Sequence, residues 1–276
     1  ASIEIPSSVT SIGNGAFQGC SSLTGITIPE SVTSIGASAF FGCSGLTSIT
    51  IPKNVTSIGD SAFYNCGNLA SIEIPSSVTS IGDSTFSWCK KLTSINIPKG
   101  VTSIGVEAFQ RCRNLESIEI PNSVTSIGDS AFDSCTNLTD ITIPESVTSI
   151  GAFAFYDTPW LTNKRQENNS LVIVNGILID GTTCSGEVTI PDGVTSIGAS
   201  AFFNCTGLTN IRMDKISPHQ HSKKCHKHWK SCVFHLYWLN QHQHSGKCYK
   251  YWKWCISALQ QFGKHQHSGR CQKHWR

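Results

Sequence analysis

Apolar residues recur along this chain in a fixed order. One unit reads L-T-S-I-T-I-P-x-S-V-T-S-I-G-x-S-A-F-x-x-C-x-x, and its V-T-S-I-G string returns every 23 residues. The string begins at Val9, Val32, Val55, Val78, Val101, Val124 and Val147, and again at Val194. One such unit cannot bury its apolar residues alone, whereas stacked units bury them against each other. The pattern therefore predicts a solenoid.

The first half of each unit predicts two short strands. Around Ile49 and Ile51, β-branched residues alternate with polar ones, which favours a strand whose alternate side chains point inward. Pro52 follows and ends the strand, because proline has no N–H for the ladder. Val55 and Ile58 predict a second inward-facing segment.

The second half of each unit predicts a turn and a short helical segment. Gly59 is expected to turn the chain. Asp60 or Ser61 can then cap one short helical turn, with Ala62 and Phe63 pointing into the core.

The pattern L-x-x-I-x-I-P-x-x-V-x-x-I-G-x-x-A-F-x-x-C resembles the BspA-like class of leucine-rich repeats, and it covers residues 1–211 apart from one interruption. The resemblance implies an α/β-type repeat solenoid, a leucine-rich-repeat rod of short parallel strands with short helical or 3-10 turns. Members of this family are typically extracellular or surface-attached and are implicated in adhesion. The resemblance therefore implies a cell-surface interaction module whose partners are proteins or surface glycans, not a specific nucleic acid.

The interruption divides the array into repeats over 1–155, a segment over 156–189 and a last repeat over 190–211. Residues 171–182 read L-V-I-V-N-G-I-L-I-D-G-T, which predicts two strands around Asn175 and Gly176. We interpret 156–189 as a β-hairpin island. It is either a structural insertion or a binding island.

Candidate binding residues lie between the two isoleucines of each I-x-I strand, where side chains point outward. They are Glu4, Thr27, Thr50, Glu73, Asn96, Glu119 and Thr142. The residues of this row have mostly short side chains, several of them with hydroxyl groups, and the row is mildly acidic. It lacks the aromatic cluster that tight interfaces favour. Two interpretations stay open: a weak multivalent binding face, or a solvated face whose threonines simply suit β structure.

Cysteines follow the same period. They stand at Cys20, Cys43, Cys66, Cys89, Cys112 and Cys135, with Cys205 in phase later and Cys184 outside the series. Because side chains in a ladder point the same way, we expect buried, reduced thiols that pack as small apolar residues, not disulfides.

The net charge of +3 hides two different compositions. Residues 1–211 hold 8 Lys and Arg against 17 Asp and Glu, whereas residues 212–276 hold 13 basic residues and one acid. All 10 histidines and five of the seven tryptophans lie in 212–276. The two parts therefore need separate interpretations.

The basic tail, residues 212–276, carries the chemistry of a zinc or nucleic-acid site, and this gives the alternative function. Its closely spaced histidines are His219, His221, His242, His244, His265 and His267. However, His219, His242 and His265 keep the 23-residue period of the repeats, and so do the histidines two positions after each. Read one base later with permitted codons, residues 251–267 yield I-G-N-G-V-F-Q-H-C-S-S-L-A-N-I-N-I. We therefore interpret the tail as poorly ordered, out-of-frame repeats that bind metal only opportunistically.

Residues 1–211 contain no histidine, no nucleophile motif and no metal triad, so we expect no catalysis and no cofactor. A spacer that holds another domain is the remaining structural possibility. The sequence has no signal peptide, no anchor motif and no apolar run long enough to span a bilayer. Because it begins inside a repeat, we expect it to be a fragment of a longer protein.

The interpretation of the tail as out-of-frame repeats makes a prediction about the nucleotide sequence across codons 205–276. The frame one base later should carry uninterrupted V-T-S-I-G repeats, and sequencing of the gene checks this. Stop codons in that frame would contradict the hypothesis.

Overall fold

The computed structural model describes residues 2–168 and 170–213. The chain divides into two compact units. The first comprises residues 1–181 and 194–201, and the second comprises 182–193 and the chain from 202 onward. Each unit is described by itself.

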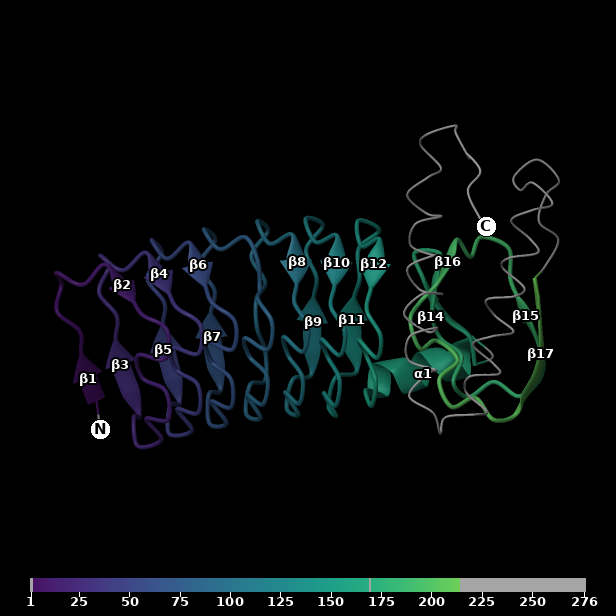
Figure 1. Ribbon diagram of the computed structural model, residues 1–276, viewed down its shortest axis with the longest axis horizontal. Helices are drawn as coiled ribbons and strands as arrows, with labels where there is room; N and C mark the ends of the chain where they lie inside the picture. The colour runs from purple at the N-terminus through teal and green to yellow at the C-terminus, as the bar shows by residue number, and fades with distance from the viewer. Residues whose placement is uncertain (1, 169, 214–276) are drawn as a thin grey trace, which may run out of the picture. The chain divides into compact units, whose positions relative to one another are not determined.

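The repeats of the first unit form a parallel-strand β-solenoid in which most coils supply one strand to each of two ladders (Figure 1). In the coil of residues 78–97, single bridges at Ile81 and Asn96 take the place of strands. The first ladder contains β1 (Ser2–Glu4), β3 (Gly25–Thr27), β5 (Ser48–Thr50), β7 (Ser71–Glu73), β9 (Ser117–Glu119) and β11 (Asp140–Thr142). The second contains β2 (Ser11–Ile12), β4 (Ser34–Ile35), β6 (Ser57–Ile58), β8 (Ser103–Ile104), β10 (Ser126–Ile127) and β12 (Ser149–Ile150). Pairing is parallel and one repeat apart, as in Ile3 with Ile26 and Ile35 with Ile58. The predicted parallel solenoid is confirmed.

The prediction of helical turns inside the repeats is wrong. The segment around Phe63 forms consecutive turns, because Ser61 and Asn65 take positive φ angles of 57° and 55°. The N–H groups of Ser61, Phe63 and Asn65 donate to carbonyls of the following coil at 2.8–2.9 Å. A helix would keep every such N–H within its own coil. Alternate N–H groups therefore hold the next coil instead of building a helix.

Asp60 does not cap a helix, contrary to the sequence-based expectation. Its Oδ1 accepts a hydrogen bond from the backbone N–H of Asp83 in the next coil at 2.9 Å. Asp83 repeats the contact with Val106 at 2.8 Å. The carboxylate at this position therefore ties neighbouring coils together.

The glycine of V-T-S-I-G is needed for close stacking between coils. A Cβ placed on Gly128 would lie 2.5 Å from the carbonyl carbon of Gly105 and from the nitrogen of Val106. Real Cβ atoms essentially never approach other atoms so closely. Absence of a side chain, more than freedom to turn, explains why glycine recurs here.

The core of the first unit is built around a column of stacked phenylalanines. Neighbouring ring centroids lie 5.2–5.7 Å apart, and the ring planes are within 12° of each other. The column contains Phe17, Phe40, Phe63, Phe86, Phe109, Phe132 and Phe155. The inward Val, Ile, Leu and Cys residues of each coil are buried in the same core.

Helix α1 (Pro159–Glu167) follows the last regular coil and covers the end of the phenylalanine column. The Trp160 ring centroid lies 4.8 Å from that of Phe155, and the backbone N–H of Trp160 donates to the backbone carbonyl of Leu138 at 2.9 Å. Thr158 caps the helix by accepting from the N–H of Leu161 at 3.2 Å. The repeat pattern does not predict this helix, although threonine before proline is a helix-start signal.

A hairpin continues the second ladder after the helix. Strands β13 (Val172–Val174) and β14 (Ile177–Asp180) pair antiparallel around Asn175 and Gly176, whose φ angles are 49° and 76°. Strand β14 then pairs parallel with β16 (Ser196–Ile197). The Asn175 side-chain amide donates to the carbonyls of Pro144 and Val147 at 2.8 and 2.9 Å. The hairpin turn is therefore fastened to the last regular coil.

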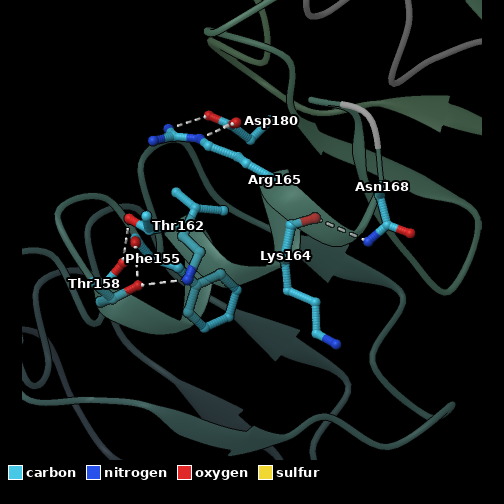
Figure 2. Close-up of polar contacts among 8 residues, drawn as sticks. Phe155, Thr158, Thr162, Lys164, Arg165, Asn168 and Asp180 are labelled. Carbon is cyan, nitrogen blue, oxygen red and sulfur yellow. Dashed lines mark hydrogen bonds and ion pairs between the residues drawn. The ribbon is translucent and has the colours of Figure 1, made fainter.

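An ion pair fastens α1 to the hairpin (Figure 2). Arg165 donates from Nε and Nη2 to the two carboxylate oxygens of Asp180 at 2.7 and 2.8 Å. Asp180 is buried, so this bidentate contact satisfies a carboxylate removed from water. These contacts favour the structural interpretation of the island.

The second unit contains a parallel pair, β15 (Gly186–Ile190) with β17 (Leu208–Met213). Strand β15 begins inside the segment 156–189. Ile190 and Leu208 are buried. The Cys205 thiol donates to the carbonyl of Cys184 at 2.9 Å, so both cysteines belong to the core of this unit.

The close coil contact predicts that Gly128→Ala lowers the free energy of unfolding by about 2–3 kcal/mol, because the added methyl overlaps backbone atoms. Urea unfolding followed by circular dichroism measures this. Gly67→Ala is the control, because its Cβ would meet no atom within 4 Å and its φ lies outside the left-handed region. Equal stability of the two variants would contradict the stacking argument.

Candidate functional site

The seven candidate binding residues form one exposed row along the first ladder, hereafter the strand face. They are Glu4, Thr27, Thr50, Glu73, Asn96, Glu119 and Thr142, and each is exposed. Neighbours are in register, as in Glu4 with Thr27 and Thr50 with Glu73. Asn96 joins the row through a single bridge to Glu73. The arrangement along the ladder follows from the repeat, whereas a binding role remains a prediction.

The side chains of the strand face have no partners among the described residues, neither in hydrogen bonds nor in ion pairs. The threonines that follow the valines in V-T-S-I-G behave differently. Thr33, Thr56 and Thr125, for example, each donate from Oγ1 to the carbonyl of the corresponding threonine one coil earlier at 3.3 Å. Hydroxyls in the second ladder therefore serve stacking, whereas those of the strand face are available to water or a ligand.

Charge on and beside the strand face is concentrated in two neighbouring coils. Glu116, Glu119 and Asp140 are all exposed there. In the part of the chain that the structure describes, none of them pairs with a cation. This end of the strand face therefore suits a basic group. In the second unit, Arg212 occupies an outward strand position and pairs with Glu187.

The cysteine ladder is a structural feature of the core. All eight described cysteines are free, and seven of them are buried. The predicted burial is confirmed for Cys43, Cys66, Cys89, Cys112, Cys135 and Cys205, and it is wrong for Cys20, which is exposed in the first coil. Each thiol of the regular array from Cys43 to Cys135 donates to a phenylalanine carbonyl of the preceding coil at 3.1–3.2 Å. These cysteines are therefore hydrogen-bond donors as well as small apolar residues.

Burial makes the core thiols poor nucleophiles. Desolvation by burial raises the pKa of Cys43 to about 11 and that of Cys89 to about 12. It raises the pKa of Cys66, Cys112 and Cys135 as well. The reactive form of cysteine is the thiolate, which these shifts suppress at neutral pH.

The remaining predictions concern metal binding and membrane-spanning segments. Within residues 2–168 and 170–213, no group of three or more His, Cys, Asp or Glu residues is arranged to hold a metal ion. The six histidines of the tail that are candidate metal ligands lie outside the described residues. No described helix is long and apolar enough to cross a bilayer.

Comparison with known proteins decides the family. A family model described as BspA type Leucine rich repeat region (6 copies) matches residues 1–112, 56–176 and 180–228. The chain belongs to the BspA-type leucine-rich repeat family. The Phe column and the Cys ladder are thus features of BspA-type coils in this chain.

Several solved structures of leucine-rich repeat proteins are similar to this chain. A protein from Bacteroides ovatus is 30% identical with a TM-score of 0.60, and the match covers 77% of this chain and 60% of that one. A protein from T. pallidum is 34% identical with a TM-score of 0.55, and the match covers 58% of this chain and 77% of that one. The chain thus spans 60% of the Bacteroides ovatus protein. No match is found among curated proteins.

The thiol environments predict selective alkylation of the native protein. Iodoacetamide should modify Cys20, which is exposed, and should leave Cys89 unmodified even at about pH 10, because a thiol with a raised pKa stays protonated below that pKa. Peptide mass mapping of the full chain measures both sites. Unfolding in urea is the control and should expose both. Modification of native Cys89 at the rate of Cys20 would contradict the prediction.

Proposed function

We propose that this chain is a protein-interaction module that binds partners through the strand face and acts in adhesion at a cell surface. The observation that carries the proposal is the row of seven exposed side chains without partners among the described residues. Leucine-rich repeat solenoids are generally protein-interaction modules, which supports a binding role. The surface location and the adhesive role rest on the family resemblance.

The repeated geometry favours weak, multivalent recognition. Successive positions of the row are about 4.8 Å apart, because that is the spacing of neighbouring strands. A partner that meets several coils at once gains avidity from individually small contacts. The acidic end around Glu119 favours a partner with a positively charged surface, whereas the threonines suit hydroxyl-rich ligands such as surface glycans.

The chain is proposed to act by binding and not by catalysis. Residues 1–211 hold no histidine, and the buried thiols are held in the unreactive protonated form. The alternative, a zinc or nucleic-acid function of the tail, falls on residues outside those described. The family match supports the repeats as the functional part.

The strand face is tested by reversing two of its charges. Glu73→Lys with Glu119→Lys should weaken binding of the full chain to immobilised extracellular-matrix proteins about three- to tenfold, because like charges then face a basic partner. Biolayer interferometry measures the change.

The matched control is Glu30→Lys with Glu145→Lys, which changes the net charge equally. Both residues are exposed, and lysine already stands at the equivalent positions Lys53 and Lys99 in other coils. Unchanged binding by the strand-face variant would remove this face from consideration. Equal loss in both variants would mean that only net charge matters.

A further inference from the structure

Five side chains from two neighbouring coils form an exposed basic patch outside the strand face. They are Trp88, Lys90, Lys91, Arg111 and Arg113, hereafter the basic patch. Trp88 and Arg111 are equivalent positions one repeat apart, and so are Lys90 and Arg113. Residues 1–211 hold 8 Lys and Arg, and four of them lie here. The three cations Lys90, Lys91 and Arg113 are exposed, and Trp88 and Arg111 are half-buried.

Two of the four cations lie over the indole ring of Trp88, and none of the four has a carboxylate partner among the described residues. Lys90 Nζ lies 5.0 Å and Arg111 Cζ 4.4 Å from the Trp88 ring centroid, within cation–π range. Among the described residues, none of the four cations forms an ion pair. The nearby Asp133 bonds instead to Gln110 Nε2 and to Ser134 Oγ, each at 2.9 Å. Positive charge is therefore left unneutralised on a part of the chain that is acidic as a whole.

The backbone conformation at Trp88 and Arg111 is unfavourable for large side chains. Trp88 and Arg111 have φ angles of 64° and 60°, in the left-handed region that bulky residues avoid. The equivalent positions in other coils carry small residues, namely Gly19, Gly42, Asn65, Ser134 and Asp157. Strain of this kind is retained where it serves a site. Two large side chains in contact at such a position therefore point to a function beyond stacking.

The composition of the basic patch resembles that of a protein-binding hot spot. Tryptophan and arginine dominate the binding energy of protein interfaces, and arginine binds carboxylates in a bidentate manner. A nucleic acid or a sulfated polysaccharide needs a continuous basic track. This patch is confined to two coils, and acids lie on the same two coils, namely Asp83, which is exposed, and Glu107, which is half-buried. A short acidic segment of a protein fits these dimensions better.

We propose that the basic patch is a second interaction surface, which binds an acidic segment of a partner protein and packs one of its apolar side chains against Trp88. This surface uses positions of the repeat that the strand face does not use. Its binding is therefore independent of the function proposed above for the strand face.

Charge reversal tests the electrostatic part. The probe is a fluorescein-labelled peptide of about ten glutamates interrupted by one phenylalanine, and its affinity for the full chain is measured by fluorescence anisotropy. Arg111→Glu with Arg113→Glu should weaken binding about tenfold or more. Lys53→Glu with Lys99→Glu is the control, because both lysines are exposed elsewhere and the charge change is the same. Equal loss in the two variants would overturn the proposal.

Replacement of Trp88 separates binding from stability. Asn65 holds the equivalent position at a φ of 55°, so Trp88→Asn fits the backbone. The variant should lose peptide affinity about tenfold while its thermal midpoint stays equal or rises, since strain is relieved. Unchanged peptide affinity with a lower thermal midpoint would mean that Trp88 is structural, and would overturn the proposal.

Competing ligands and self-association complete the test. Heparin or single-stranded DNA that binds more tightly than the peptide, and depends on Arg111 and Arg113, would overturn the assignment to a protein segment. Self-association of the chain that Arg111→Glu with Arg113→Glu abolishes, measured by sedimentation velocity, would overturn it in favour of a second copy. The variant Glu73→Lys with Glu119→Lys should keep its peptide affinity, so failure of either surface is recognised separately.

Discussion

Contact between the backbones of neighbouring coils is the constraint on which the first unit depends. Turn N–H groups, such as those of Ser61 and Phe63, donate to the following coil, whereas the N–H of Gly59 donates to Ile35 of the preceding one. Each coil is thus held from both sides. The bonds form only if equivalent residues face each other, so the period of 23 residues cannot drift. Glycine at Gly128 and its equivalents follows from the same close approach.

Exact repetition turns every position of the unit into a column. Inward columns become the stacked phenylalanines and the thiols that donate to phenylalanine carbonyls. Outward columns become continuous faces, of which the strand face is one. A function that uses such a face is built by small changes within a fixed frame, as with Glu73 where neighbouring coils have Thr50 and Asn96. The basic patch is the opposite case, because it depends on departures from the repeat in two coils.

The interruption shows how a solenoid accommodates a change of architecture. The column of rings meets Trp160, which covers Phe155 with an apolar face. Strand β14 then offers β16 a parallel partner, so the second ladder resumes. The Arg165–Asp180 pair joins the helix and hairpin in between. Because a buried carboxylate left unpaired is costly, this pair fixes the orientation of the helix relative to the hairpin.

Local sequence and tertiary contacts determine different features of this protein. The period and the alternation of apolar residues were enough to predict the parallel ladders, the inward phenylalanines and the outward row from Glu4 to Thr142, because side-chain direction in a strand alternates strictly. They also placed the turn at Asn175 and Gly176. The helical turns were predicted wrongly, because Ser61 and Asn65 take positive φ angles to bond with the next coil, and that coil is not visible in one repeat.

Only the tertiary structure decided the remaining features. The sequence gives no reason why glycine follows the isoleucine of V-T-S-I-G, since the clash it avoids is with the neighbouring coil. Nor does it reveal that Arg111 lies against Trp88, because these residues are 23 positions apart and meet only when coils stack. The sequence by itself determined what each coil buries and exposes, through local periodicity. The structure decided what the coils do to one another, because those contacts join residues distant in sequence.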